Sequence, residues 1–231
     1  MYGAEAHNVK TLIVIPLLNE SAVLAHKLGE LDVLRAMGAQ VLLVDGGSTD
    51  HTVHLGRDAG FDVLESARGR AQQMNAGARA TGSDVLVFLH VDTRLPSGAL
   101  YQIEKHLNRQ AGWGRFDVRI IGRSPWLRVV SYCMNLRSRL TGIATGDQVF
   151  FMTRELFERV GGFPEQPLME DIEMSKQLKR FSPPVCLTDQ VETSGRRWEQ
   201  KGVWKTILLM WRLRWAYWRG VSATELAHLY R

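Results

Sequence analysis

Three largely apolar stretches of this chain end in polar side chains of the kinds that bind metal ions and nucleotides. The stretches and the polar residues that follow them are 12–16 with Asn19 and Glu20, 41–44 with Asp45 and Ser48, and 84–91 with Asp92. Apolar runs of this length predict strands buried on both faces, and ligands of open α/β sheets bind outside the carboxyl ends of such strands. Helix capping or turn formation explains any one of these polar residues, but explains all of them together less well.

A nucleotide diphosphate needs a hydrogen-bond acceptor for its base or ribose, positive charge near its phosphates, and backbone that can approach closely. Asp45 could accept from the base, and the glycine pair 46–47 leaves room for backbone approach. Arg68 and Arg70 could bind phosphate oxygens in bidentate fashion, although a solvated loop explains both arginines equally well. Asp92 would hold Mg²⁺ or Mn²⁺, since these hard ions take few protein carboxylates and complete their coordination with phosphates and water.

Alternating strand and helix patterns must position these residues. Strands are predicted over 11–17, 40–45, 61–65 and 84–91, and helices over 20–37, 50–59, 71–80 and 97–108. The alternation predicts an α/β fold with a Rossmann-like, mostly parallel central sheet and helices on both faces. Beyond residue 110 the pattern is mixed, with strands over 115–121 and 148–152 and helices over 126–141 and 172–180. Neither G-x-G-x-x-G nor a P-loop sequence occurs, which disfavours dinucleotide dehydrogenases and P-loop enzymes.

The length of 231 residues fits a single domain spanning 1–231. We expect a nucleotide-binding half over about 10–110, an acceptor half over about 111–200, and a C-terminal tryptophan-rich amphipathic helix over about 203–220. Two isolated cysteines favour a reducing compartment, and the first ten residues lack a secretory signal, so we expect a cytoplasmic protein. No run is long and uncharged enough to span a bilayer.

The C-terminal segment differs in composition from the rest of the chain. From residue 193 onward eight Lys or Arg and two Glu give a net charge of +6, and five of the seven tryptophans lie there. In a helix over 203–220, one stripe would be formed by Trp204, Leu208, Trp211, Trp215 and Trp218, flanked by Lys205, Arg212 and Arg219. Such a face suits the inner surface of a membrane, but packing onto the domain is the interpretation that we favour. Nucleic acid is not expected as a partner, because the segment carries no recognised nucleic-acid-binding motif.

The motifs resemble those of family 2 glycosyltransferases of GT-A fold. The resemblance rests on residues 13–20 (IVIPLLNE), 44–50 (VDGGSTD), 90–92 (HVD) and 169–171 (MED), which occur in the family's order and rough spacing. The short length and the wording of 88–96 (FLHVDTRLP) further resemble the small bacterial subgroup called selenodomain-associated transferases. The resemblance covers about residues 10–200.

The family resemblance implies an inverting, metal-dependent transfer of a sugar from a UDP- or GDP-linked donor. It places Pro16, Asn19, Glu20, Asp45 and Ser48 around the nucleoside. Asp92 corresponds to the metal-binding end of the family's Asp-x-Asp motif, whereas His90 replaces its first aspartate. Asp171 corresponds to the base that takes a proton from the acceptor hydroxyl, with Glu170 as its neighbour.

Arg197 and Trp198 faintly resemble the Gln-x-x-Arg-Trp motif of processive synthases in the same family, with Ser194 at the Gln position. An arginine stacked beside a tryptophan near the acceptor is one interpretation, and an ordinary loop pair is the other. Two other functions are compatible with the residues. One is a nucleotidyltransferase acting on a sugar phosphate, and the other is a non-catalytic module that binds sugar nucleotides or membranes.

Overall fold

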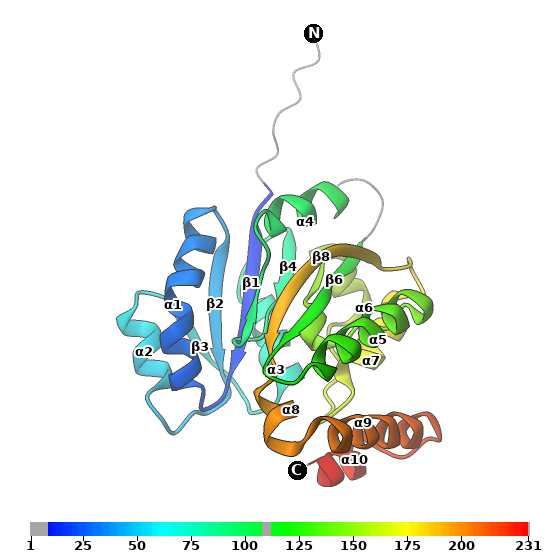
Figure 1. The fold of residues 1–231 in the computed structure, drawn as a ribbon. Helices are drawn as coiled ribbons and strands as arrows, with labels where there is room; N and C mark the ends of the chain where they lie inside the picture. Colours follow the sequence, from blue (N-terminus) through cyan, green and yellow to red (C-terminus); the bar gives the residue numbers. More distant parts are fainter. Residues whose placement is uncertain (1–8, 108–111, 231) are drawn as a thin grey trace.

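The computed structural model describes residues 9–107 and 112–230 as one mixed α/β fold (Figure 1). The described strands are β1 (Thr11–Leu17), β2 (Gln40–Asp45), β3 (Asp62–Glu65), β4 (Val85–Phe88), β5 (Thr93–Arg94), β6 (Trp113–Ile121), β7 (Phe150–Thr153) and β8 (Val185–Ser194). They form one sheet in the order β3-β2-β1-β4-β7-β6-β8-β5. The described helices are α1 (Ser21–Ala36), α2 (Thr52–Asp58), α3 (Arg70–Arg79), α4 (Ala99–Leu107), α5 (Trp126–Thr141), α6 (Arg154–Val160), α7 (Glu170–Leu178), α8 (Arg196–Lys201), α9 (Val203–Trp218) and α10 (Ala223–Tyr230).

The first half of the sheet is parallel, as its sequence predicts, and the second half is mixed. Strands β3, β2, β1 and β4 pair in parallel, and β6 pairs in parallel with β8. Strand β7 runs antiparallel to both β4 and β6, and β5 runs antiparallel to β8. The parallel prediction therefore describes β1 to β4, while the sheet beyond β4 contains antiparallel strands. The sequence pattern did not reveal β5, β8, α6, α8 or α10, and the predicted end of the fourth helix at residue 108 lies outside the described residues.

Two hydrophobic cores cover the two faces of the sheet. Alternate residues of β1 show the division, because Ile13 and Ile15 face one core while Leu12 and Val14 face the other. Helices α1, α4 and α5 contribute to the first core, and α3, α6 and α7 contribute to the second. Helix α3 packs closely on the sheet at Gly77, which has no side chain. A Cβ atom there would lie only 2.5 Å from the Val14 side chain. The polar ends of β1, β2 and β4 are thereby held at one edge.

The outer half of β6 is covered on one edge by a helix instead of a strand. Strand β6 pairs with β7 only over 113–115. Beyond that point the Val118 N–H donates to Asn135 Oδ1 at 2.8 Å, and Asn135 Nδ2 donates to the Val118 carbonyl at 3.0 Å. The Ile120 N–H donates to Ser131 Oγ at 2.9 Å. Side chains of α5 thus satisfy backbone groups that a neighbouring strand would otherwise bond.

The C-terminal segment forms the predicted amphipathic helix, but the expected packing of its tryptophan stripe is wrong. The stripe of α9 is exposed to solvent, with 57% of Trp204, 72% of Trp211 and 80% of Trp218 accessible. The opposite side of α9 is the packed one, where Leu213 joins a small core with Met169 and Leu226. This happens because α10, which the sequence analysis did not predict, folds back against that opposite side (Figure 1). None of the described helices is long and apolar enough to cross a membrane.

Candidate active site

The ends of β1 and β2 form a tightly hydrogen-bonded loop pair. Parallel pairing places Leu17 beside Asp45, so the loops that follow both strands leave the sheet together. The Asn19 N–H donates to Ser48 Oγ at 2.8 Å, and Asn19 Oδ1 accepts from the Thr49 N–H at 2.8 Å. Asn19 adopts a left-handed conformation (φ 53°), which asparagine tolerates better than most residues. These contacts fix the mouth of the predicted nucleoside site, beside the half-buried Pro16.

Asp45 orders this loop through its own carboxylate. Its Oδ2 accepts from the N–H groups of Gly47 and Ser48, each at 2.8 Å, and the Ser48 hydroxyl donates to Oδ1 at 2.5 Å. Only 2% of Asp45 is exposed. The carboxylate therefore shapes the loop directly, and the predicted contact between Asp45 and the base stays a prediction.

Glu20, in the loop after β1, lies within electrostatic reach of Asp92, which follows β4. Burial raises the pKa of Glu20 above its ordinary value, opposed by the Arg196 guanidinium and assisted by the charge of Asp92. Arg196 Nη2 lies 3.8 Å from Glu20 Oε2. The structure thus brings Glu20 and Asp92 together, although 72 positions separate them in the sequence. Asp92 itself accepts only a long hydrogen bond of 3.5 Å from Thr93 Oγ1 among the described residues, so its carboxylate is available to a ligand.

His90, which replaces the family's first aspartate, faces a carboxylate from another segment. His90 Nδ1 lies 3.4 Å from Asp147 Oδ1. Burial opposes ionisation of Asp147, but the hydrogen bond and charge of His90 hold its pKa below the ordinary value. Asp147 lies in the short turn Gly146–Gln148. A Cβ atom at Gly146 would come within 2.5 Å of the His90 ring, so this turn packs directly against His90. Sequence reasoning missed Asp147, because a lone aspartate in a short turn carries no distinctive signal.

A pair of carboxylates begins helix α7, with Glu170 buried and Asp171 half-buried. Met169, just before the helix, adopts a left-handed conformation (φ 66°) and lets Glu170 and Asp171 turn into the site. Asp171 accepts from the Ile172 N–H at 2.7 Å and from the Gly146 N–H at 3.3 Å. Burial, followed by the charge of Glu170, raises the pKa of Asp171 to about 6. An aspartate with this pKa holds a proton more firmly than an ordinary one and is still ionised at neutral pH, as a general base requires.

The two predicted phosphate-binding arginines are not equivalent. Arg70 Nη1 lies 3.5 Å from Glu170 Oε1, so Arg70 joins the site from the start of α3. Arg68 is exposed on the preceding loop. The structure therefore brings Arg70 to the carboxylate pair, while a phosphate contact of Arg68 stays a prediction.

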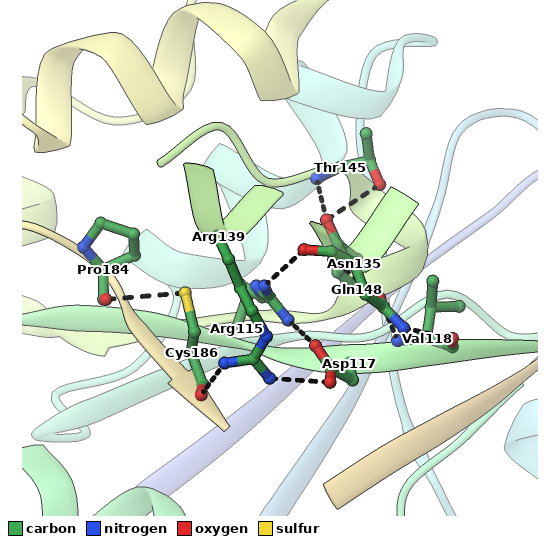
Figure 2. A network of polar contacts seen from close by, with 9 residues as sticks. All are labelled: Arg115, Asp117, Val118, Asn135, Arg139, Thr145, Gln148, Pro184 and Cys186. Carbon is green, nitrogen blue, oxygen red and sulfur yellow. Dashed lines mark hydrogen bonds and ion pairs between the residues drawn. The ribbon is translucent and has the colours of Figure 1, made fainter. Parts of the chain in front are cut away.

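A polar network behind the site holds the turn that carries Asp147. Figure 2 shows the contacts running from Arg115 and Asp117 through Asn135 to Gln148. Gln148 Nε2 donates to Asn135 Oδ1 at 3.3 Å, and its Oε1 accepts from the Thr145 N–H at 3.2 Å. Arg115 is fully buried and pairs with Asp117. The network fixes the 145–148 turn, and with it the Gly146 N–H that donates to Asp171.

Arg137, on the same helix as Asn135, is a cation with unused donors within electrostatic reach of Asp171. Its Nε and Nη2 are buried and have no hydrogen-bond partner within residues 9–107 and 112–230. Burial lowers the pKa of Arg137, and the charge of Asp171 opposes this effect. Buried donors without partners are rare and suit a site that receives an anionic ligand. Sequence reasoning missed Arg137, because its position within a helix resembles that of any surface arginine.

The expected pair of Arg197 and Trp198 is not formed. The Arg197 guanidinium stacks over the Tyr230 ring at 3.8 Å. The half-buried Trp198 instead packs against the core to which α1, α4 and α5 contribute. Adjacent residues of a helix point in different directions, which explains why the two side chains separate. The charges of Arg197, Arg70, Asp147 and Asp171 all influence the pKa of Tyr230, which burial raises. Tyr230, from the last described helix, is therefore a member of this site.

The comparisons with known proteins identify the family. The model of "Glycosyl transferase family 2" matches residues 12–161. The chain belongs to glycosyl transferase family 2. Poly-beta-1,6-N-acetyl-D-glucosamine synthase of Staphylococcus aureus (strain COL) is 24% identical over 211 residues, covering 80% of this chain and 51% of the synthase. The chain thus spans about half the length of the curated relatives that it matches.

Two solved structures share the fold. A mannosyltransferase from Pyrobaculum calidifontis, in complex with GDP-Man and Mn²⁺, superposes with a TM-score of 0.62 at 22% identity, covering 90% of this chain and 61% of that one. S. aureus TarS 1-349 in complex with UDP-GlcNAc gives a TM-score of 0.63 at 15% identity, covering 80% and 58%. The predictions of family 2 and of a GT-A fold are confirmed, and the narrower selenodomain-associated subgroup stays a prediction.

Proposed function

We propose that this chain transfers a sugar from a nucleotide diphosphate donor to an acceptor hydroxyl, with inversion at the anomeric carbon. The acceptor oxygen attacks that carbon, the bond to the diphosphate breaks, and Asp171 takes the acceptor proton. The observation that carries the proposal is the half-buried Asp171, whose pKa is raised to about 6 and whose carboxylate is held by the Gly146 and Ile172 N–H groups. The glycosyltransferases named above, to which the chain is related, support the same chemistry.

The donor is proposed to be linked to UDP or GDP and to lie across the ends of β1, β2 and β4. Complexes of similar folds contain GDP-Man or UDP-GlcNAc. The 18–20 and 45–49 loops would hold the nucleoside, and Arg70 with Arg137 would meet negative charge on the diphosphate or acceptor side. No nucleic-acid partner is proposed. A cytoplasmic location, with at most peripheral attachment to the inner face of a membrane, stays a prediction.

The residues near the end of β4 fit a divalent cation. Asp92 offers a carboxylate with a single long hydrogen bond, and the His90–Asp147 pair lies on the neighbouring segments. No group of three or more His, Cys, Asp or Glu side chains with metal-binding geometry occurs among the described residues. Mg²⁺ and Mn²⁺ can take most of their ligands from phosphates and water, so Asp92 would be the protein ligand. The bound ion would neutralise charge on the leaving diphosphate.

The test combines calorimetric binding with donor hydrolysis. UDP, GDP and their sugar conjugates are titrated with and without Mn²⁺ into wild type and Asp92→Asn. We expect metal-dependent binding of one diphosphate by wild type, strongly weakened in Asp92→Asn. Asp171→Asn is expected to keep donor binding and to lose at least about a hundredfold in slow donor hydrolysis, whereas Glu165→Gln, which removes an exposed carboxylate, leaves both unchanged.

Two results would contradict the proposal. Full hydrolysis by Asp171→Asn would remove its assignment as the base. Release of pyrophosphate from a nucleoside triphosphate and a sugar phosphate would identify a nucleotidyltransferase instead.

A further inference from the structure

An apolar surface on α9 is left without a partner. We define the tryptophan face as Trp126, Trp204, Leu208, Trp211, Trp215 and Trp218. All six side chains are between 47% and 80% exposed. The Trp126 ring, from the first turn of α5, lies 4.9 Å from the Trp204 ring, so the face extends from α9 onto α5. Contiguous exposed apolar surface of this kind marks a site of interaction with a protein or a membrane.

The opposite side of α9 holds the helix firmly on the domain. Leu213 is 1% exposed and packs with Met169, the residue that precedes the carboxylate pair of α7. The Tyr217 hydroxyl donates to Glu173 Oε2 at 3.3 Å, and Lys176 Nζ lies 5.0 Å from the Tyr217 ring. Helix α9 is therefore fixed to the helix that carries Asp171. The tryptophan face is turned outward because α9 is held from behind.

Positive charge borders the tryptophan face. Lys205, Arg212 and Arg219 are exposed at intervals of seven residues along one flank. The Arg219 guanidinium lies 5.2 Å from the Trp215 ring, so cation and aromatic surface are in contact. Helix α9 contains no Asp or Glu. The partner surface must therefore accept indole rings and also carry negative charge.

We propose that the tryptophan face docks the protein onto a lipid bilayer whose headgroups are anionic. Indole rings bind at the boundary between headgroups and acyl chains, while lysine and arginine side chains at the edge reach lipid phosphates. The helix would lie in the plane of the surface, because its length and charges exclude a spanning orientation. Cations along the flank attract such a membrane from a distance and increase the rate of encounter.

A second copy of the chain fits this surface less well. If two copies paired through the same face with their α9 helices antiparallel, the two-fold symmetry would bring the same flanks together. Lys205, Arg212 and Arg219 of each copy would then approach like charges without intervening carboxylates, because α9 has none. An anionic bilayer satisfies the indole rings and the cations together.

Docking would also orient the catalytic machinery. Because α9 packs on Met169 and Tyr217 contacts Glu173, the base helix α7 would be held at a fixed position relative to the bilayer. The acceptor would then be a hydroxyl presented at the membrane surface. This last step rests on the proposed glycosyl transfer, whereas docking itself does not.

The test is co-flotation of the full chain with vesicles of phosphatidylcholine alone or of an equimolar mixture with phosphatidylglycerol. We expect binding to the anionic vesicles and little to the neutral ones. The Trp211→Ser/Trp215→Ser variant should bind at least about tenfold more weakly, because it removes apolar contact area. The Lys205→Gln/Arg212→Gln variant should lose about fivefold for each cation and become less sensitive to salt.

A matched control lies on α4, where Lys105 Nζ lies 5.8 Å from the ring of Tyr101, which is 64% exposed. The Tyr101→Ser/Lys105→Gln variant should float like wild type. Circular dichroism and UDP or GDP binding should be equal in all these surface variants, which shows that the fold and nucleotide site are intact. Asp171→Asn should also dock normally, so that failure of docking and failure of the proposed catalysis are distinguished.

Either of two outcomes overturns the proposal. The first is vesicle binding that the tryptophan and charge substitutions leave unchanged. The second is absence of vesicle binding together with a wild-type dimer, measured by sedimentation, that Trp211→Ser/Trp215→Ser converts to monomer. That result would assign the face to a second copy of the chain.

Discussion

Replacement of Asp171 by asparagine should stabilise the fold at alkaline pH and should not do so in acid. The pKa of Asp171 is raised from its ordinary 3.8 to about 6 by burial and by the charge of Glu170. The folded state therefore binds this proton more tightly than the unfolded state does. The stabilisation from this protonated carboxyl is fully present below the unfolded pKa and is lost as the pH rises through about 6.

The magnitude follows from the difference between the two pKa values. A difference of about two pH units corresponds to up to about 3 kcal/mol of unfolding free energy, which wild type loses between about pH 4 and pH 6. The asparagine in Asp171→Asn carries no charge at any pH in this range. The substitution also loses an acceptor for either the Gly146 or the Ile172 N–H, at a cost of about 1 kcal/mol. The net expectation is a loss of about 1 kcal/mol at pH 4 and a gain of about 2 kcal/mol at pH 8.

Urea denaturation of wild type and Asp171→Asn at several values between about pH 4 and pH 8 measures this difference, and needs neither donor nor acceptor. Glu165→Gln, which removes an exposed carboxylate from the loop before α7, serves as the control and should follow wild type. The reasoning is refuted if the difference between wild type and Asp171→Asn is constant across the pH range. That result would mean that Asp171 titrates alike in the folded and unfolded chains.

Three further substitutions test other parts of the site. Glu170→Gln removes the negative charge that, after burial, raises the pKa of Asp171, so the fall in donor hydrolysis rate on acidification should occur at lower pH. An unchanged pH profile would argue against electrostatic coupling of Glu170 and Asp171. Asp45→Asn weakens the charged hydrogen bonds from the Gly47 and Ser48 N–H groups and should reduce nucleotide affinity about tenfold or more, measured by calorimetry. Unchanged affinity would exclude this loop from the nucleoside site. Arg137→Met replaces buried donors that lack partners, and should raise stability in urea by about 1 kcal/mol while weakening diphosphate binding; loss of stability would indicate a structural role.

The sequence predicted the fold of residues 10–107 well because each element there has a strong local signal. The strand over 40–45 and the helix over 126–141 were predicted with the bounds that the structure shows. Apolar runs define the parallel strands, and the resemblance to family 2 predicted the residues that gather at their ends. Asn19, Glu20, Asp45, Ser48 and Asp92 were all selected in this way.

The fold from residue 112 onward was less predictable because its contacts are made over long distances in the sequence. Strand β8 has few buried residues and little alternation, so its pattern is weak. Asp147 and Tyr230 reach the site only through the pairing of distant segments. The exposure of the tryptophan stripe depended on α10, because a helix with apolar residues on several sides can be covered from any of them. The periodicity of Trp204 and Trp211 was correct, but periodicity alone does not say which face is buried.

The hydrogen bonds between α5 and β6 constrain which substitutions α5 can accept without loss of the fold. Asn135 and Ser131, one turn apart, replace an entire neighbouring strand for Val118 and Ile120. A foreign strand cannot add to this edge of β6 while the helix occupies its donors and acceptors, so this part of the sheet is protected from pairing with other chains. The inner side of α5 must therefore keep an amide and a hydroxyl at this spacing. Its outer side is free of that requirement and can acquire new surface chemistry without opening the sheet.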